Sequence, residues 1–167
     1  RITVKTPWDV INDITDGGLG AGELGVVVAP AGIGKSWTLQ ALGAHVIRKN
    51  KTIVHYTLEL NETYVGLRYD SIFSGITTSN IKYYKEDVSK KLSELQGKLL
   101  IKYFPTKAAS VQTLGAHLKQ IELSGTKVDM VIVDYADILM PTGNFKEDML
   151  FIEEQFADFQ GKNPANY

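Results

Sequence analysis

The stretch Ala29-Pro-Ala-Gly-Ile-Gly-Lys-Ser36 has the form Ala/Gly-x-x-x-x-Gly-Lys-Ser/Thr, which is typical of a phosphate-binding loop (P-loop). An apolar run, Leu24-Gly-Val-Val-Val28, precedes it, and an amphipathic pattern from Trp37 to about Lys49 follows it. We therefore predict a strand, a loop and a helix in this order. The alternative is a glycine-rich turn that binds nothing.

The chemistry of the loop favours capture of a nucleotide. Gly32 and Gly34 let the loop turn its backbone N–H groups toward an anion, and the positive end of the following helix points at the same place. Lys35 adds a full charge near the β- and γ-phosphates, and the Ser36 hydroxyl can bind Mg²⁺. The residues predicted to contact the nucleotide are Ala29, Pro30, Ala31, Gly32, Ile33, Gly34, Lys35, Ser36 and Trp37.

Composition sets the limits of the fold and of the function. The 167 residues suit one domain, and 44% apolar residues allow a real core. A net charge of −1 argues against a generally basic nucleic-acid-binding surface, although a local patch stays possible. There is no cysteine, which excludes disulfides and thiolate metal sites. No apolar run approaches the ~20 residues that span a bilayer, so we expect no membrane association.

Three further apolar runs read as strands: Thr52–Leu58, Lys98–Phe104 and Val128–Asp134. Helical patterns alternate with them. They run from Thr6, as N-cap, to Ile14, from Asn61 to about Ser74, from Ser79 or Asn80 to about Gln96, from Val111 behind a Ser110 cap to about Leu123, and from Asp148 to about Gln160. This alternation predicts an α/β fold, a mainly parallel β-sheet flanked by helices on both faces.

Two carboxylates stand where predicted strands end. Glu59 follows the strand at 52–58, and Asp134 ends the strand at 128–134. In open α/β sheets, ligands bind outside the carboxyl ends of the strands. Asp134 therefore reads as a Walker B residue that holds Mg²⁺. Position alone leaves two readings of Glu59 open, a base that activates water and a cap of the next helix. His45, His55 and His117 show no ligand spacing and read as structural.

Four stretches together resemble the RecA-like motor domain of the DnaB-type hexameric replicative helicases, most closely those of T-even-type phages. The stretches are Gly22–Ser36, His55–Leu60, Leu100–Thr106 and Val131–Leu139, and the resemblance covers about residues 1–147. It implies a RecA-like P-loop NTPase fold. In this family the Thr-Leu-Glu-Leu stretch carries the catalytic base, which makes Glu59 the base beside Lys35, and the Asp-Tyr after the last strand is the Walker B ending.

The resemblance also implies partners and a setting. ATP and Mg²⁺ would bind at the subunit interfaces of a homo-hexameric ring, with single-stranded DNA in its central channel. The loop around Thr142 to Lys146 would face the channel, which makes Asn144 and Lys146 candidate DNA contacts. A primase and a helicase loader are the expected partners, and the cytoplasm of a phage-infected bacterial cell is the expected location.

The sequence departs from the family pattern in two ways. That family carries a further strand, lying between the P-loop strand and the Walker B strand, with a polar sensor of the γ-phosphate, and later an arginine finger. Neither is found after Glu147. We therefore expect residues 1–167 to form a single RecA-like domain that is a piece of a longer helicase, with 148–167 as a helix plus tail.

Two other functions stay open from the sequence. A RecA/RadA-type recombinase shares the fold, the P-loop and a glutamate after the second strand, and differs in forming an open filament. A nucleotide-binding regulatory module without motor activity fits the missing sensor and finger. The intact Lys35, Ser36, Glu59 and Asp134 favour the helicase motor.

Overall fold

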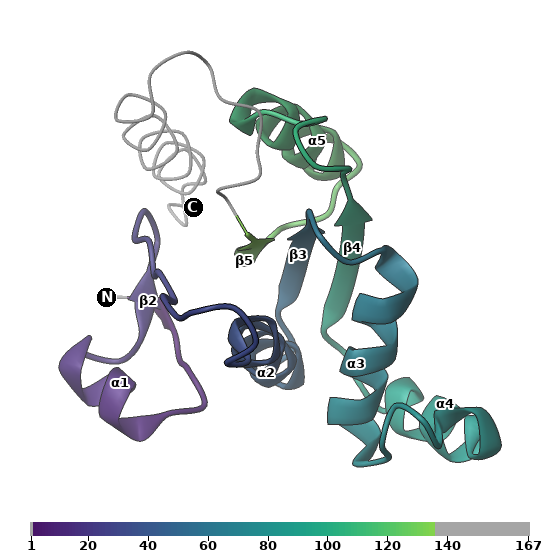
Figure 1. The fold of residues 1–167 in the computed structure, drawn as a ribbon. Helices are drawn as coiled ribbons and strands as arrows, with labels where there is room; N and C mark the ends of the chain where they lie inside the picture. The colour runs from purple at the N-terminus through teal and green to yellow at the C-terminus, as the bar shows by residue number, and fades with distance from the viewer. Residues whose placement is uncertain (1, 136–167) are drawn as a thin grey trace. The chain divides into compact units, whose positions relative to one another are not determined.

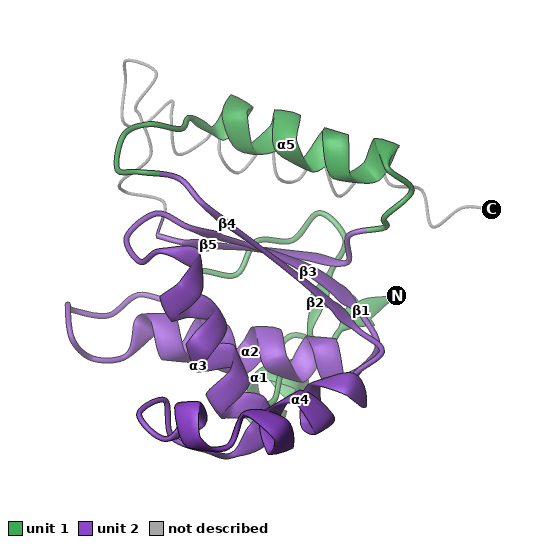
Figure 2. Cartoon of the chain, turned by 90° about the vertical axis from the view of Figure 1, so that its right-hand side faces the viewer, with its two compact units in different colours: residues 1–26, 105–127, 136–167 green, residues 27–104, 128–135 purple. Residues whose placement is uncertain are grey.

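The computed structural model describes residues 2–135, which divide into two compact units (Figure 2). Of these residues, 2–26 and 105–127 belong to unit 1, whereas 27–104 and 128–135 belong to unit 2. Unit 2 contains the P-loop, Glu59 and Asp134. It is therefore the unit that positions the site.

Unit 2 is built on a three-stranded sheet in the order β4-β3-β5 (Figure 1). The strands are β3 (Thr52–Thr57), β4 (Lys98–Tyr103) and β5 (Met130–Asp134). Both neighbours run parallel to β3, and Thr57 at its end lies opposite Tyr103 and Asp134. All three strands therefore end at the same edge, and the prediction of a mainly parallel sheet is confirmed.

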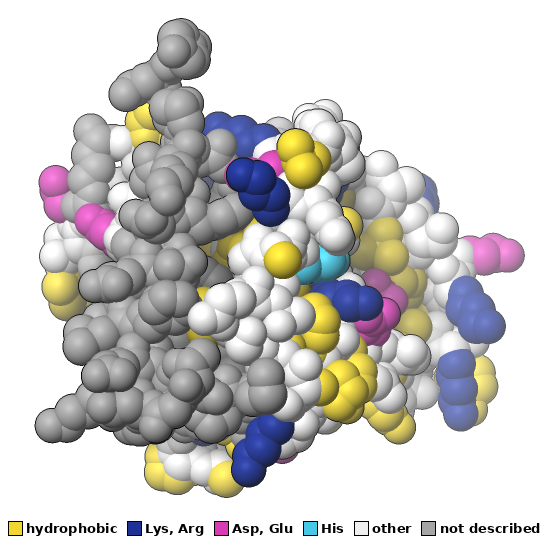
Figure 3. Space-filling view, turned by 90° about the horizontal axis from the view of Figure 1, so that it is seen from above, with side chains coloured by type: hydrophobic (Ala, Val, Ile, Leu, Met, Phe, Trp, Pro, Cys, Tyr) yellow, Lys and Arg dark blue, Asp and Glu magenta, His cyan; other side chains and the backbone are white. Residues whose placement is uncertain are grey.

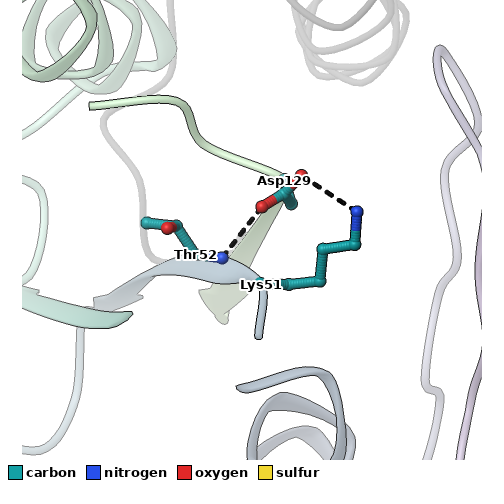
Figure 4. Close-up of polar contacts among 3 residues, drawn as sticks. All are labelled: Lys51, Thr52 and Asp129. Carbon is teal, nitrogen blue, oxygen red and sulfur yellow. Dashed lines mark hydrogen bonds and ion pairs between the residues drawn. The ribbon is translucent and has the colours of Figure 1, made fainter. Parts of the chain in front are cut away.

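The opposite edge of the sheet is held by Asp129, directly before β5 (Figure 4). Its Oδ2 accepts a hydrogen bond of 2.9 Å from the backbone N–H of Thr52, and its Oδ1 lies 3.6 Å from Nζ of Lys51. The backbone N–H of Asp129 also donates to the carbonyl of Thr52 at 2.9 Å. These contacts set the start of β5 against the start of β3.

Helices α2 (Lys35–Arg48) and α3 (Glu62–Ser74) lie on one face of this sheet (Figure 1). The Asn61 side chain caps α3 by accepting a 3.0 Å hydrogen bond from the backbone N–H of Tyr64. The core between these layers comprises Ala44, Val46, Ile47, Ile53, Val65, Tyr69 and Ile132.

The helix expected from about residue 80 to residue 96 is in fact two shorter elements. A 3₁₀ turn, η1 (Ile81–Tyr83), is followed by α4 (Lys85–Ser93). Tyr84, between them, has φ −125° and ψ 34°, which is not helical backbone. The break therefore comes from backbone geometry that the charge pattern of this stretch did not reveal.

The described residues of unit 1, 2–26 and 105–127, form a short two-stranded sheet and two helices. The antiparallel pair β1 (Thr3–Val4) and β2 (Leu19–Gly20) was not predicted, since each strand has only two residues. Helix α5 (Val111–Leu123) was predicted with its cap. Oγ of Ser110 accepts a hydrogen bond from the backbone N–H of Thr113, and Oγ1 of Thr113 accepts one from the backbone N–H of Ser110.

The predicted start of the first helix is wrong. Helix α1 spans Asp9–Ile14 and its N-cap is Trp8, without a side-chain cap. Thr6 is instead held by Asn12, whose Oδ1 accepts from the Thr6 backbone N–H at 2.8 Å and whose Nδ2 donates to the Thr6 carbonyl at 2.9 Å. This reciprocal pair keeps Thr6 outside the helix.

The predicted strand before the P-loop is not formed. Residues 24–28 have no regular secondary structure. The apolar side chains of this run are exposed: Leu24 47%, Val26 68%, Val27 40% and Val28 87%. A strand needs a neighbour to bond its N–H and C=O groups, and no strand among residues 2–135 pairs with this run. In the resembled fold that neighbour is the sensor strand.

Several predictions lie outside the described residues. These are the helix at 148–160 with its tail, and the loop with Asn144 and Lys146. Within residues 2–135, no helix combines the length and the apolar composition needed to cross a membrane.

Candidate functional site

The P-loop has the backbone that its glycines predict. Gly32 and Gly34 have φ values of +80° and +105°, in the region that side chains disfavour, and Gly34 is the N-cap of α2. Helix α2 therefore begins at Lys35, two residues earlier than expected. The backbone N–H groups from residue 31 to residue 36 donate no hydrogen bond to any described residue. Among residues 2–135 no acceptor therefore competes with an anion at the positive end of the helix.

The middle of the loop is exposed to solvent, and the helix that follows the loop is in contact with α3. Ile33 is 71% exposed, and Trp37, in the first turn of α2, is 43% exposed. The guanidinium of Arg68 on α3 lies 5.0 Å from the centre of the Trp37 ring. Arg68 thus packs on the ring of Trp37. It also ties the start of α2 to α3.

Lys35 lies beside the end of β5. Its Nζ is 5.3 Å from the centre of the Tyr135 ring, and Tyr135 directly follows Asp134. The structure thus brings the lysine of the P-loop to the edge where β5 ends, as the sequence led us to expect.

Glu59 stands at the same edge. The backbone N–H of Leu58 donates a 2.9 Å hydrogen bond to the carbonyl of Asp134, so the chain enters Glu59 directly beside the end of β5. Leu58 is 1% exposed, whereas Glu59 is exposed. The N-cap of α3 is Asn61, so the reading of Glu59 as that cap is wrong. Its carboxylate is therefore available at the strand ends.

Asp134 and Ser36 fit a hydrated Mg²⁺ bound to a nucleotide. Asp134 is 6% exposed at the end of β5, and Ser36 lies in the first turn of α2. Carboxylate and hydroxyl oxygens are donors that Mg²⁺ accepts, and it usually completes its shell with water and phosphate oxygens. Residues 2–135 contain no group of three or more His, Cys, Asp or Glu side chains that could hold a metal ion without such help.

Three buried polar residues lie between the helices and the sheet next to the site. From the sequence, one of them was given only a structural role and the other two were not singled out. His55 was predicted to be structural, and it is buried and paired: its Nδ1 lies 2.8 Å from the hydroxyl of Tyr69. Burial lowers the pKa of His55 to about 4, which keeps the ring neutral. Tyr69 and Gln40, both buried, were not singled out. A histidine inside an otherwise β-rich apolar run was the available signal.

Figure 3 shows the described residues from above, with basic and acidic side chains both present. On the described residues of this face, basic and acidic side chains are interspersed with hydrophobic ones, without a broad area of one sign. This agrees with the net charge of −1.

Comparison with known proteins gives one family. The family described as "DnaB-like helicase C terminal domain" matches residues 3–154. A curated relative, the "DnaB-like replicative helicase" of Enterobacteria phage T4, is 29% identical over 145 residues, covering 80% of this chain and 30% of that protein.

Two solved structures share the fold. One, described as "The Structure Of A DnaB-Like Replicative Helicase And Its Interactions With Primase", matches with a TM-score of 0.72 and 14% identity, over 95% of this chain and 41% of that chain. The other, described as an ATPase domain, matches with a TM-score of 0.60 and 14% identity, over 78% of this chain and 51% of that one. The chain thus spans less than a third of the curated relative.

Proposed function

Because the chain belongs to the DnaB-like helicase C-terminal domain family, we propose that it is the ATP-hydrolysing motor domain of a phage replicative helicase. The observation that carries this proposal is the meeting of three groups at one sheet edge. Lys35 lies 5.3 Å from the ring of Tyr135, and the chain entering Glu59 is hydrogen-bonded to the carbonyl of Asp134 at 2.9 Å. Phosphate binding, water activation and metal binding can therefore share one site.

Each residue has a distinct part in the proposed reaction. The N–H groups of residues 31–36, which donate to no described residue, and the Lys35 ammonium hold the phosphates of ATP. Glu59 orients the attacking water and accepts its proton. Ser36 and Asp134 hold Mg²⁺, which when bound neutralises charge on the β- and γ-phosphate oxygens.

The assembly and the partners belong to the same proposal. We infer a hexameric ring that translocates on single-stranded DNA, with Asn144 and Lys146 as DNA contacts. A primase is the expected partner because one of the two similar structures is described as a DnaB-like replicative helicase with its interactions with primase. A helicase loader and the cytoplasm of the infected bacterium complete the setting that the family resemblance implies.

The test uses the full-length natural protein. We expect ATP hydrolysis that single-stranded DNA stimulates, and ATP-dependent unwinding of a forked duplex. Joint-molecule formation between homologous strands without unwinding would transfer the assignment to a recombinase. Nucleotide binding without hydrolysis, with or without DNA, would identify a regulatory module instead.

A further inference from the structure

A group of buried polar side chains lies between helix α2 and the sheet. Gln40, His55 and Tyr69 are each no more than 1% exposed. They come from three elements, α2, β3 and α3 respectively. Glutamine, histidine and tyrosine are rarely buried to this degree unless hydrogen bonding or function retains them.

Tyr69 and His55 form an uncharged hydrogen bond. The Tyr69 hydroxyl and Nδ1 of His55 are 2.8 Å apart, and the two rings meet edge to face at 5.6 Å between centroids. Burial lowers the pKa of His55 to about 4, so the ring is neutral near pH 7. Burial, and secondarily the charge of Asp134, raises the pKa of Tyr69. The pair therefore keeps its protons fixed under working conditions.

The Tyr69 hydroxyl also abuts the backbone of α2 at Gly43. A Cβ at this position would collide with the hydroxyl and would lie 3.1 Å from Cδ1 of Ile132. Ile132 is on β5, in register with His55 on β3. Because residue 43 has no side chain, α2, α3, β3 and β5 can meet around one hydroxyl group.

Several polar atoms of this group have no hydrogen-bond partner among the described residues. Nε2 of His55 and both amide atoms of Gln40 are buried without a hydrogen-bond partner among the described residues. Gln40 lies one helical turn before Gly43, on the same side of α2 and nearer the P-loop. Apolar side chains would fill this layer at a lower cost in stability, so packing alone does not account for these residues.

We propose that Tyr69 and His55 are positioning residues that hold the P-loop helix at a set distance from strand β3. Helix α2 begins at Lys35 and β3 leads into Glu59. A contact that fixes α2 against β3 therefore fixes the phosphate-binding group relative to the water-activating group. This inference rests on the proposed ATPase function.

The expected effect is on the chemical step. Small displacements of reacting groups slow reactions strongly, whereas nucleotide binding depends mainly on the loop itself. Tyr69→Phe removes only the hydroxyl and retains the ring. In the full-length protein we expect kcat for ATP hydrolysis to fall by about tenfold or more, with KM and nucleotide affinity changed by less than about threefold.

Two variants test the geometry separately. His55→Asn places an amide near the position of Nδ1 and should retain most of the wild-type kcat. Gly43→Ala should lower kcat because its methyl group displaces the Tyr69 hydroxyl. In the Tyr69→Phe background the collision with the hydroxyl is gone, although contacts of 3.1 Å to Cδ1 of Ile132 and 3.2 Å to a ring carbon of residue 69 remain. The double variant should therefore lose less kcat than the two single losses combined predict.

Tyr56→Phe is the matched control. Tyr56 is as deeply buried, adjoins His55 on β3, and points to the other face of the strand. Its loss of a hydroxyl can change the melting temperature but should leave kcat within about twofold of the wild-type value.

The outcomes separate the two proposals. If the wild-type protein hydrolyses ATP and Tyr69→Phe does so with the same kcat, the positioning role is overturned and the proposed ATPase function stands. An equal loss of kcat in Tyr56→Phe, or an equal loss of nucleotide affinity in Tyr69→Phe, would also overturn the positioning role, because the effect would then be structural. A wild-type protein that binds but does not hydrolyse ATP would overturn the proposed function, and this inference with it.

Discussion

Lys35 and Glu59 act at different stages of the proposed reaction, although both stand at the carboxyl edge of the sheet. Lys35 meets phosphate oxygens before and during the reaction. Glu59 acts on water only as the reaction proceeds. An interaction present in both the ground state and the transition state governs binding, whereas one present only in the transition state governs kcat.

We therefore expect a split between two substitutions. Lys35→Ala should abolish measurable ATP binding. Glu59→Gln should retain binding and lose about 10²–10⁴ in the hydrolysis rate, the usual contribution of a positioned base. Equilibrium binding of a fluorescent ATP analogue and steady-state ATPase assays measure the two effects. If Glu59→Gln hydrolyses ATP at the wild-type rate, another residue is the base.

His55 predicts a dependence of stability on pH. The unfolded chain takes up a proton at this imidazole as the pH falls through about 6.5, whereas the folded protein does so only near its pKa of about 4. The folded state therefore loses stability as the pH falls from about 6.5 to about 4, and loses no more from this group below that. The total is about 3 kcal/mol.

The check is denaturant unfolding of the wild type and of His55→Asn at several pH values. The difference between their free energies of unfolding should change between pH 7 and pH 4.5, since asparagine does not titrate. Parallel pH profiles for the two proteins would contradict the lowered pKa.

The sequence pointed to the residues of the site that local patterns mark better than to those that tertiary packing brings together. Lys35 and Asp134 follow from spacing and from strand ends, which are local properties. Tyr69 could not be found in this way, because its partners are brought to it by tertiary packing: His55 precedes it by 14 residues, and Gly43 lies on another helix. Nothing local marks a tyrosine that packs against a glycine of a different element.

At the scale of elements, Asp129 is the contact that sets β5 against β3. Asp129→Ala would leave the Thr52 N–H without its side-chain acceptor in a part-buried position, at a cost of about 1–3 kcal/mol. Asp129→Asn keeps an acceptor and should cost less. Lys51→Ala should change stability by less than about 1 kcal/mol, because Lys51 is 40% exposed and exposed ion pairs contribute little.

Denaturant unfolding of the three variants gives the order directly. The ion pair, and not the hydrogen bond, would be the dominant contact if Lys51→Ala proved as destabilising as Asp129→Ala. Asp129→Asn serves as the matched variant that removes charge and retains shape.

The three strands of the parallel sheet were predicted well, whereas the strand expected before the P-loop is absent from the described structure. Strands β3, β4 and β5 lie within a residue or two of the predicted bounds, because each coincides with one of the apolar runs of the sequence. The run 24–28 has the same composition and is not a strand. A local sequence pattern indicates which segment can form a strand, whereas pairing into a sheet also requires a second strand beside it.

At the scale of the whole molecule, the proposed phosphate-binding groups lack part of their structural support among residues 2–135. The apolar run before the P-loop is exposed, and β5 pairs with β3 on one side only within the described residues. Unpaired backbone groups at such an edge are costly unless another segment covers them. The P-loop therefore lacks an anchor on its amino-terminal side among residues 2–135.

We expect this chain alone, as a monomer, to bind ATP weakly or not at all and to hydrolyse it far more slowly than the full-length protein. Two causes act together. The unanchored loop raises the cost of ordering the phosphate site. A neighbouring subunit's arginine finger, worth about 10³–10⁵ in kcat in related phosphoryl-transfer sites, is also missing from a monomer. Within the chain, Arg48 donates to the carbonyl of Ile72 and Arg68 lies over Trp37.

The comparison requires both proteins at the same concentration of Mg²⁺ and ATP. Isothermal titration gives the two affinities, light scattering confirms that the short chain is monomeric, and a coupled assay gives the two rates. Turnover by the monomeric short chain at the full-length rate would show that neither the anchor nor a neighbouring subunit is needed. Weak binding that is restored when the short chain is forced to oligomerise would assign the deficit to the missing neighbour. Weak binding that persists in the oligomer would assign it to the exposed run at 24–28.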